Sequence, residues 1–320
     1  MVSLQMQSKM DRLFKKFLSK TAFLLLSCSA LLFTACNSDS GTENTETEKV
    51  QEEEISLDMD VTREDVARED FQRMLDEVPK PTQVPMLIEE SGVEFNESLP
   101  LPVSQTESYM TTSDQAALAL GVYGSDLGYM SVYGKAQEAI DYLNANQRLI
   151  EHIGISNALE ATLLKRFEAN LSNTDSLVSI VNESIDFARD YLAESERFES
   201  AALIATGSMI EGLYIATSLV KNYPQDVATE QRSEQLKNLI KTILMQKESL
   251  EDLVTVLDVV NYQDEKYVQL KDEVSELYDM YDLIGVEQQL ERNPEELLQE
   301  ETLNDITTKV AEIRGMIINI

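Results

Sequence analysis

The chain has 320 residues, of which 58 are acidic and 26 basic, so its formal net charge at pH 7 is −32. A surface this rich in carboxylates repels phosphate backbones, which excludes nucleic acid as a partner. One histidine and two cysteines leave little for nucleophilic or metal chemistry, and we expect no metal and no other cofactor.

The first 36 residues join a basic segment to an apolar run. The apolar run, residues 21–33, is too short to span a bilayer as a helix and is typical of a secretory signal. It ends in LLFTAC, in which the small residue Ala35 precedes Cys36. The basic segment before it contains Lys9, Arg12, Lys15, Lys16 and Lys20.

This ending resembles the lipobox of bacterial lipoproteins, although Phe33 stands where leucine is usual. The resemblance implies that signal peptidase II removes residues 1–35 and that Cys36 becomes an acylated N-terminus in the lipid bilayer. Cys28 would leave with the signal, so the mature chain would have neither a thiol nor a disulfide. An ordinary signal peptide and an uncleaved anchor are the alternatives.

Without residues 1–35, which hold five basic residues and one acidic residue, 21 basic and 57 acidic residues remain, a net charge of −36. This charge repels an anionic leaflet, so the lipid is the expected attachment.

Residues 37–60 are acidic and poor in apolar side chains, which predicts that 36–60 is a lipidated, disordered tether. Acids soon after the cysteine resemble the surface-export signals of Bacteroidetes lipoproteins. We therefore expect a lipid-anchored protein of the cell envelope, in the outer membrane, on its periplasmic face or at the cell surface.

Residues 61–112 combine a short helix with a proline-rich segment. Polar residues in 58–69 match the ligand positions of an EF-hand calcium loop, but Arg63 stands where that loop needs glycine. Thr62 and Asp65 form a variant capping box, so the start of a helix is favoured over calcium binding. Five of the seven prolines fall in 79–102, here called the strap. This density excludes regular helix and predicts extended chain along the surface of the next domain. The apolar face of the helix consists of Ala67, Phe71, Met74, Leu75 and Val78.

Residues 113–320 predict an all-α domain, either an antiparallel helical bundle or an irregular array of about eight helices. Apolar residues recur at spacings of three and four, and no run alternates with period two. The first helix begins at Ser113 and the fifth ends near Asn222. The others are expected over about 136–153, 156–171, 175–195, 229–260, 267–284 and from Pro294 onward.

Residues 121–134, GVYGSDLGYMSVYG, hold four of the eleven glycines. On a helix, Ala117, Gly121, Gly124 and Gly128 form one smooth stripe, and small residues from Ala201 to Ala216, including Gly212, form another. Each glycine weakens a helix by about 1 kcal/mol relative to alanine, so an offsetting interaction is expected. Close packing against a neighbouring helix is the first interpretation. A ligand cleft and a helix break near 124–134 are the alternatives.

Glu211 is the only charge between Glu199 and Lys221, which predicts a helix buried at the centre of the domain rather than a membrane span. Tyr214 shares the face of Glu211, and Tyr129 and Tyr133 share the face of Asp126. Two acids among tyrosines predict a ligand-binding or general acid–base site. The alternative is structural: Glu211 bonds a tyrosine hydroxyl or a helix end, and Asp126 is solvated.

The residues of common catalytic sites are missing. His152 falls at a helix end, and the glycine-rich stretch lacks both GK[ST] and GxGxxG. The sequence therefore predicts a non-enzymatic binding or scaffolding lipoprotein whose partner is an unidentified envelope protein. The alternatives are a small-ligand receptor with a pocket between helices and a carboxylate-dependent enzyme. The chain as a whole resembles uncharacterised all-helical lipoproteins of Bacteroidetes.

Overall fold

The computed structural model describes residues 63–155, 160–223, 229–283 and 301–319. Cys36, the expected signal peptide and the expected tether lie outside these residues. The described part is all-α, with eleven α-helices, one 3-10 helix and no strand. The elements are α2 (Arg63–Glu77), α3 (Gln83–Glu90), η1 (Val103–Tyr109), α4 (Ser113–Val132), α5 (Ala136–Ile153), α6 (Glu160–Ala169), α7 (Thr174–Glu194), α8 (Phe198–Lys221), α9 (Thr229–Leu244), α10 (Lys247–Val259), α11 (Glu265–Leu283) and α14 (Glu301–Asn319).

Local sequence signals set several helix ends. Thr112 caps α4 by accepting a hydrogen bond from the backbone N–H of Gln115, and Asn173 caps α7 in the same way. Gly154 ends α5 with φ of 82°, and Gly134 follows α4 with φ of 64°. α4 is continuous through Gly124 and Gly128 and ends at Val132, so the helix is interrupted only at the far end of the stretch 124–134.

Two boundary predictions need correction. The strap was expected to exclude helix, but α3 lies within it, with Pro85 at its third residue. The first three N–H groups of a helix have no partner inside the helix, so a proline there costs no hydrogen bond. The single helix expected over 229–260 is divided into α9 and α10, because the chain turns at Met245 and Gln246.

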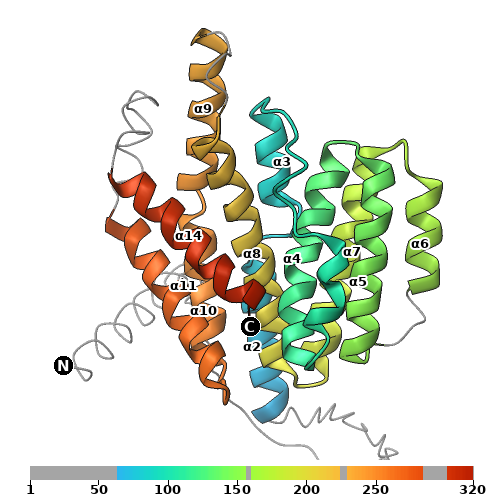
Figure 1. Ribbon diagram of the computed structural model, residues 1–320. Coiled ribbons are helices and arrows are strands. Elements are labelled where there is room, and N and C mark those ends of the chain that lie inside the picture. Colours follow the sequence, from blue (N-terminus) through green and yellow to red (C-terminus); the bar gives the residue numbers. More distant parts are fainter. Residues whose placement is uncertain (1–62, 156–159, 224–228, 284–300, 320) are drawn as a thin grey trace, which may run out of the picture. The chain divides into compact units, whose positions relative to one another are not determined.

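Helices α4 and α8 form the centre of the fold and share its most extensive helix–helix contact (Figure 1). The Oγ of Ser200, near the start of α8, donates to Oδ1 of Asp114, near the start of α4, at 2.6 Å. Further along, Gly121 of α4 lies against Ile204 and Ser208 of α8. The two helices therefore run in the same direction, so the antiparallel expectation fails for this pair.

The other helices pack around this pair. Figure 1 shows α5 and α7 on one side, with α6 beyond them, and α10, α11 and α14 on the other; the contacts agree. α2 contacts α7, α8 and α10, and α3 contacts α4, α8 and α9. α8 is the one described helix that is long and apolar enough to cross a membrane, yet 94% of its apolar window is buried inside the protein. The prediction of a buried central helix is confirmed.

Glycine permits the close approach of α4 and α8, but the pairing differs from the two predicted stripes. A Cβ at Gly121 would lie 2.1 Å from the carbonyl oxygen of Ile204, and a Cβ at Gly207 would lie 2.1 Å from that of Leu118. Gly207, which neither stripe included, is thus the counterpart of Gly121. Gly124 and Gly128 face other neighbours, the Ile185 side chain of α7 and residues 81–82 of the strap, and Gly212 faces Val84 of α3.

We expect Gly121→Ala and Gly207→Ala each to lower the free energy of unfolding by about 3 kcal/mol or more, because the new Cβ meets backbone atoms that cannot move aside. Gly124→Leu and Gly212→Leu should cost about 1–3 kcal/mol, since the contacts there are with side chains. Urea unfolding of the full chain measures these differences.

Gly315 is the matched control, because it lies in α14 and a Cβ there meets nothing within 4 Å. Gly315→Ala should be neutral or stabilising by up to about 1 kcal/mol. If Gly121→Ala proved as stable as Gly315→Ala, the close contact of α4 with α8 would be refuted.

Candidate functional site

Two acidic side chains meet inside the protein where α4 and α8 pack together. Asp126 of α4 and Glu211 of α8 are both fully buried. Each carboxyl group acts on the pKa of the other, so the pair that was expected from the sequence does share one site. The parallel packing of their helices produces this meeting, because both residues lie about the same distance along their helices from the end where Asp114 bonds Ser200.

Arg314 of α14 neutralises Glu211. Its Nε donates to Oε2 of Glu211 at 3.0 Å and its Nη2 donates to Oε1 at 3.1 Å, a two-bond fork between guanidinium and carboxylate. The ring of Tyr214 covers the other side of the guanidinium, 4.2 Å from its central carbon. The Arg314 side chain is only 11% exposed, so the ion pair is largely shielded from water.

Asp126 is held from the opposite direction by the strap. The backbone N–H of Leu101 donates to Oδ2 of Asp126 at 2.9 Å. The other oxygen, Oδ1, has no N–H or O–H donor among the described residues. The side chains of Asp126 and Glu211 also act on one another, and the proton that two neighbouring carboxyl groups share favours Asp126.

Tyrosines of α4 bind the backbone of the same part of the strap. The ring of Phe95 packs on two of them, with its centroid 4.9 Å from that of Tyr129 and 5.5 Å from that of Tyr133. The hydroxyl of Tyr129 accepts from the N–H of Asn96 at 2.9 Å, that of Tyr133 donates to the carbonyl of Val93 at 2.7 Å, and that of Tyr123 donates to the carbonyl of Pro102 at 3.0 Å. The strap thus occupies the tyrosine face on which the sequence predicted a ligand.

Burial dominates the electrostatics of the pair. Desolvation, and then the charge of Glu211, hold the pKa of Asp126 well above its usual range, against the Leu101 N–H and Arg314. Desolvation also raises the pKa of Glu211, while Arg314 opposes the rise. These shifts favour a site in which Asp126 keeps its proton while Glu211, paired with Arg314, is ionised, so that the enclosed groups carry no net charge. Burial also raises the pKa of Tyr129, to about 12, so the phenol keeps its proton.

This arrangement can hold a proton, but it offers no surface to a substrate. A general acid or base must come within hydrogen-bond reach of the group on which it acts. Asp126 and Glu211 are instead enclosed by α4, α8, α14 and the strap. His152 lies exposed in the last turn of α5, whereas both acids are fully buried. Among the described residues no three His, Cys, Asp or Glu side chains are placed to hold a metal ion.

Sequence reasoning found both acids and Tyr214, but it missed Arg314 and the N–H of Leu101. Arg314 follows Ile313 in the apolar seam of α14, whose buried residues include Ile306, Val310 and Ile317. A basic residue one position from an apolar seam is the sequence signal that could have indicated a cation near the core. The Leu101 N–H carries no sequence signal, because backbone donors look alike in every residue except proline.

Comparison of the chain with models of protein families, with curated proteins and with solved structures found no match.

We expect Asp126→Asn to remove a pH dependence of stability. The pKa of Asp126 is raised in the folded state, so its stabilising contribution is complete below the usual value of 3.8 and is lost as pH rises from there towards the folded value. Asparagine keeps an acceptor for Leu101 and a donor for Glu211 without titrating. The stability of Asp126→Asn relative to wild type should rise with pH, at up to about 1.4 kcal/mol per pH unit. Urea unfolding between pH 4 and pH 8 measures it, and parallel curves would contradict a neutral, buried Asp126.

We expect Glu211→Gln and Asp126→Asn to be strongly non-additive. In Glu211→Gln alone, Asp126 can ionise and take over the charge of Arg314, so the loss should be about 1–3 kcal/mol. The double variant leaves Arg314 with no carboxylate, and its loss should exceed the sum of the two single losses by about 1 kcal/mol or more.

Adding Arg314→Leu to the double variant is the control, and it should recover stability by removing the unpaired charge. If the losses of unfolding free energy were additive, or if Arg314→Leu restored no stability, Asp126 would not ionise to pair with Arg314.

Proposed function

We propose that this protein is a lipid-anchored, non-enzymatic binding or scaffolding module of the bacterial cell envelope. In this proposal Cys36 carries the lipid, residues 36–60 are the tether, and the irregular array of helices from α2 to α14 is the working body. The partner is an envelope protein. The anchor belongs to the outer membrane, on its periplasmic face or at the cell surface.

The observation that carries the proposal is the sequence LLFTAC at the end of the apolar run 21–33. A small residue directly before cysteine at such a position is the mark of lipoprotein signals. The acidic composition agrees with a lipid anchor, since a strongly negative surface cannot hold to anionic lipid by charge.

The interior supports a scaffold rather than an enzyme. Both buried acids are engaged by the chain's own groups, Asp126 by Leu101 and Glu211 by Arg314. The glycine contact between α4 and α8 leaves no room between the two central helices. A close-packed interior of this kind keeps the surface in a fixed shape, which suits a partner-binding module.

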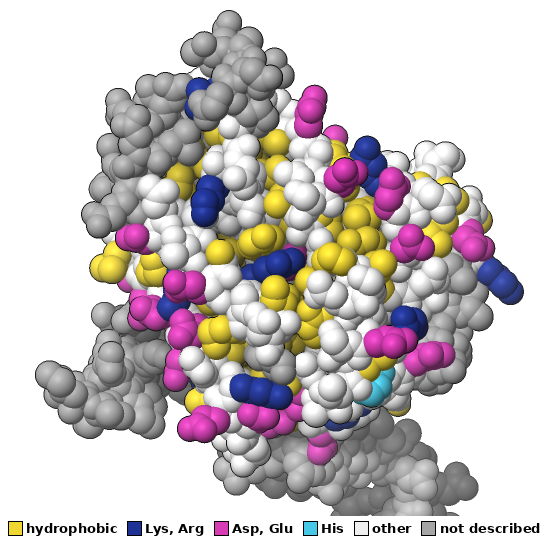
Figure 2. Space-filling view, in the orientation of Figure 1, with side chains coloured by type: hydrophobic (Ala, Val, Ile, Leu, Met, Phe, Trp, Pro, Cys, Tyr) yellow, Lys and Arg dark blue, Asp and Glu magenta, His cyan; other side chains and the backbone are white. Residues whose placement is uncertain are grey.

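The surface supports a protein partner. Figure 2 shows hydrophobic side chains in patches across the middle of one face, while Asp and Glu lie mostly towards its margin. Figure 2 also shows Lys and Arg side chains among these patches, and a face that combines apolar patches with basic groups inside an acidic margin is suited to binding a protein.

We expect Cys36→Ser to release the protein from membranes. The hydroxyl of serine cannot form the thioether that would carry the lipid, so the variant should move from the membrane fraction to the soluble fraction. Fractionation with immunoblotting, together with mass spectrometry of the N-terminal peptide, provides the measurement.

Cys28→Ser is the matched control, because Cys28 lies within the expected signal and should not affect attachment. A mature N-terminus other than residue 36, or a residue 36 without acyl mass, would disprove the anchor.

A further inference from the structure

Helix α14 packs on α8 and α11 and touches α4. The surface of α8 and α11 that it covers is here called the α14 seat. Arg314 makes its two-bond fork with Glu211 of α8. Lys309 donates from Nζ to two acids of α11, Glu273 and Glu276. An acidic seat thus receives a helix with basic side chains and an apolar stripe, which consists of Leu303, Ile306, Val310, Ile313 and Ile317.

The acid at the base of the seat requires a cation. Glu211 is fully buried, and among the described residues no basic side chain other than Arg314 bonds it. A buried carboxylate without a partner is costly, so the seat disfavours a helix that lacks a basic side chain at this position. The planar guanidinium supplies two parallel bonds, which an ammonium group cannot do. The seat is therefore selective for a helix with an arginine.

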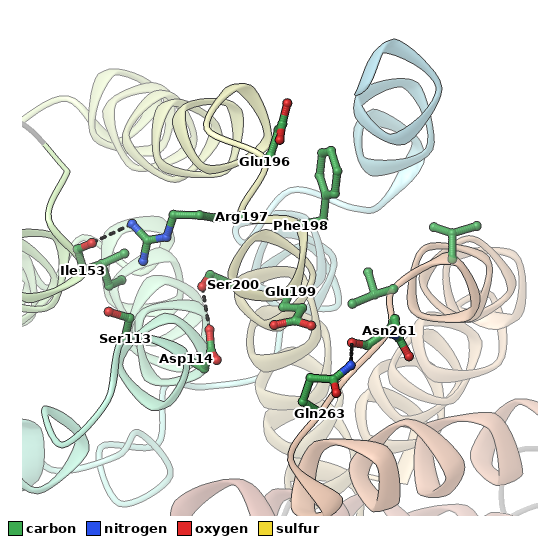
Figure 3. A pocket seen from close by; sticks show the side chains of 12 residues that line it. Ser113, Asp114, Ile153, Glu196, Arg197, Phe198, Glu199, Ser200, Asn261 and Gln263 are labelled. Carbon is green, nitrogen blue, oxygen red and sulfur yellow. Dashed lines mark hydrogen bonds between the residues drawn. The ribbon is translucent and has the colours of Figure 1, made fainter. Parts of the chain in front are cut away.

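The side of Glu211 that Arg314 covers is the one from which a cation can enter. An open cavity of about 690 Å³ lies where α4 and α8 begin, and it is lined by Asp114 and Glu199 among others (Figure 3). Neither Glu211 nor any residue of α14 lines it. This cavity therefore gives no access to the buried acid, whereas the Arg314 side chain is 11% exposed and reaches Glu211 from the surface.

The resident helix α14 is intrinsically weak. Eight of its 19 residues are β-branched, and it also contains Gly315. A Cβ at Gly315 would meet nothing within 4 Å, so no described neighbour requires the glycine. Both kinds of residue lower the stability of a helix, and a glycine does so by about 1 kcal/mol relative to alanine. α14 therefore depends on the seat for its helical form.

The docking of α14 provides selectivity more than strength. A buried ion pair often contributes no more to stability than apolar side chains of similar volume, because both charges lose their hydration. It does reject a helix that has the wrong charge. A weakly formed helix that is held by such a pair can be replaced by a better-formed helix with the same side chains.

We propose that the α14 seat binds an amphipathic helix of a partner protein, which displaces α14 and places an arginine on Glu211. The partner helix has an apolar stripe and a basic residue directed towards Glu273 and Glu276. This names the kind of partner for the binding module proposed above and so rests on that function, but it does not rest on the lipid anchor. Variants of Cys36 test the anchor and the tests below concern Glu211 and Arg314, so the two proposals can fail separately.

The probe is a fluorescein-labelled synthetic peptide of residues 301–319 that carries Gly315→Ala, which favours its helical form. The receptor is the full-length chain in mild detergent with Arg314→Leu, whose own α14 no longer supplies the cation. Fluorescence anisotropy should show saturable binding about tenfold tighter than to the wild-type chain, because the peptide restores hydrogen bonds to a charged group. The same peptide with Arg314→Leu should bind this receptor about tenfold more weakly. A second receptor, Arg314→Lys, keeps the charge without the fork and should have intermediate affinity.

Two controls separate the buried acids from the rest of the seat. Adding Asp126→Asn and Glu211→Gln to the Arg314→Leu receptor removes both carboxyl groups, and the two peptides should then bind within about threefold of one another. Arg148→Leu makes the same change at an exposed arginine of α5 and should leave binding as in the wild-type chain. The circular dichroism spectrum and Tm of each receptor show whether it is folded.

The proposal would be overturned by the absence of saturable binding to the Arg314→Leu and Arg314→Lys receptors, or by equal binding of the two peptides to the first of them. A preference for the arginine peptide that persisted without the two carboxyl groups would also overturn it. So would a receptor that is a dimer by light scattering and becomes a monomer with the peptide, since the occupant of the seat would then be α14 of a second copy.

Discussion

The contact between α4 and α8 is the constraint on which the rest of the structure depends. Gly121 and Gly207 bring the two backbones so close that no side chain fits between them. Three helices separate α4 from α8 in the chain, and because successive helices reverse direction, the two run parallel. Parallel contact has two consequences. It places Asp126 beside Glu211 in the interior, and it brings two positive helix ends together, where Asp114 and Glu199 offset them.

The buried pair makes the fold depend on segments that are remote in sequence. Two carboxyl groups enclosed together cannot both ionise, so one keeps its proton and the other needs a cation. That cation is Arg314, 103 residues after Glu211, and it arrives on the last described helix. The strap contributes the Leu101 N–H to Asp126 from the other side. An internal charge therefore selects how α14 and the strap dock, in addition to the apolar area that they bury.

The sequence predicts the helices well because each needs only its own apolar period and end signals, as with Asn173 before α7 and Gly154 after α5. It also predicts the burial of Glu211, since twenty uncharged neighbours leave no solvated face. It fails where partners come from elsewhere in the chain. Gly207 counts as a packing residue only once Leu118 is known to face it, and α3 contains a proline that is harmless only at that position. The cavity at the helix starts arises from the meeting of α4, α5, α8 and the segment after α10, which no local pattern encodes.

The same chemistry has different uses at the two places where acids gather. Inside, Asp126 and Glu211 meet with a matched cation, a backbone donor and covering tyrosines, so no unbalanced charge is left for a ligand. At the helix starts, the compensation comes from partial charges and from Arg197, which is already bonded to Ile153. Partial charges that are fixed to the backbone cannot neutralise a carboxylate fully, and the space in front of Glu199 is open. Of the two acid pairs, only the one at the helix starts borders open space, whereas the inner pair is enclosed and each of its members is engaged by the chain's own groups.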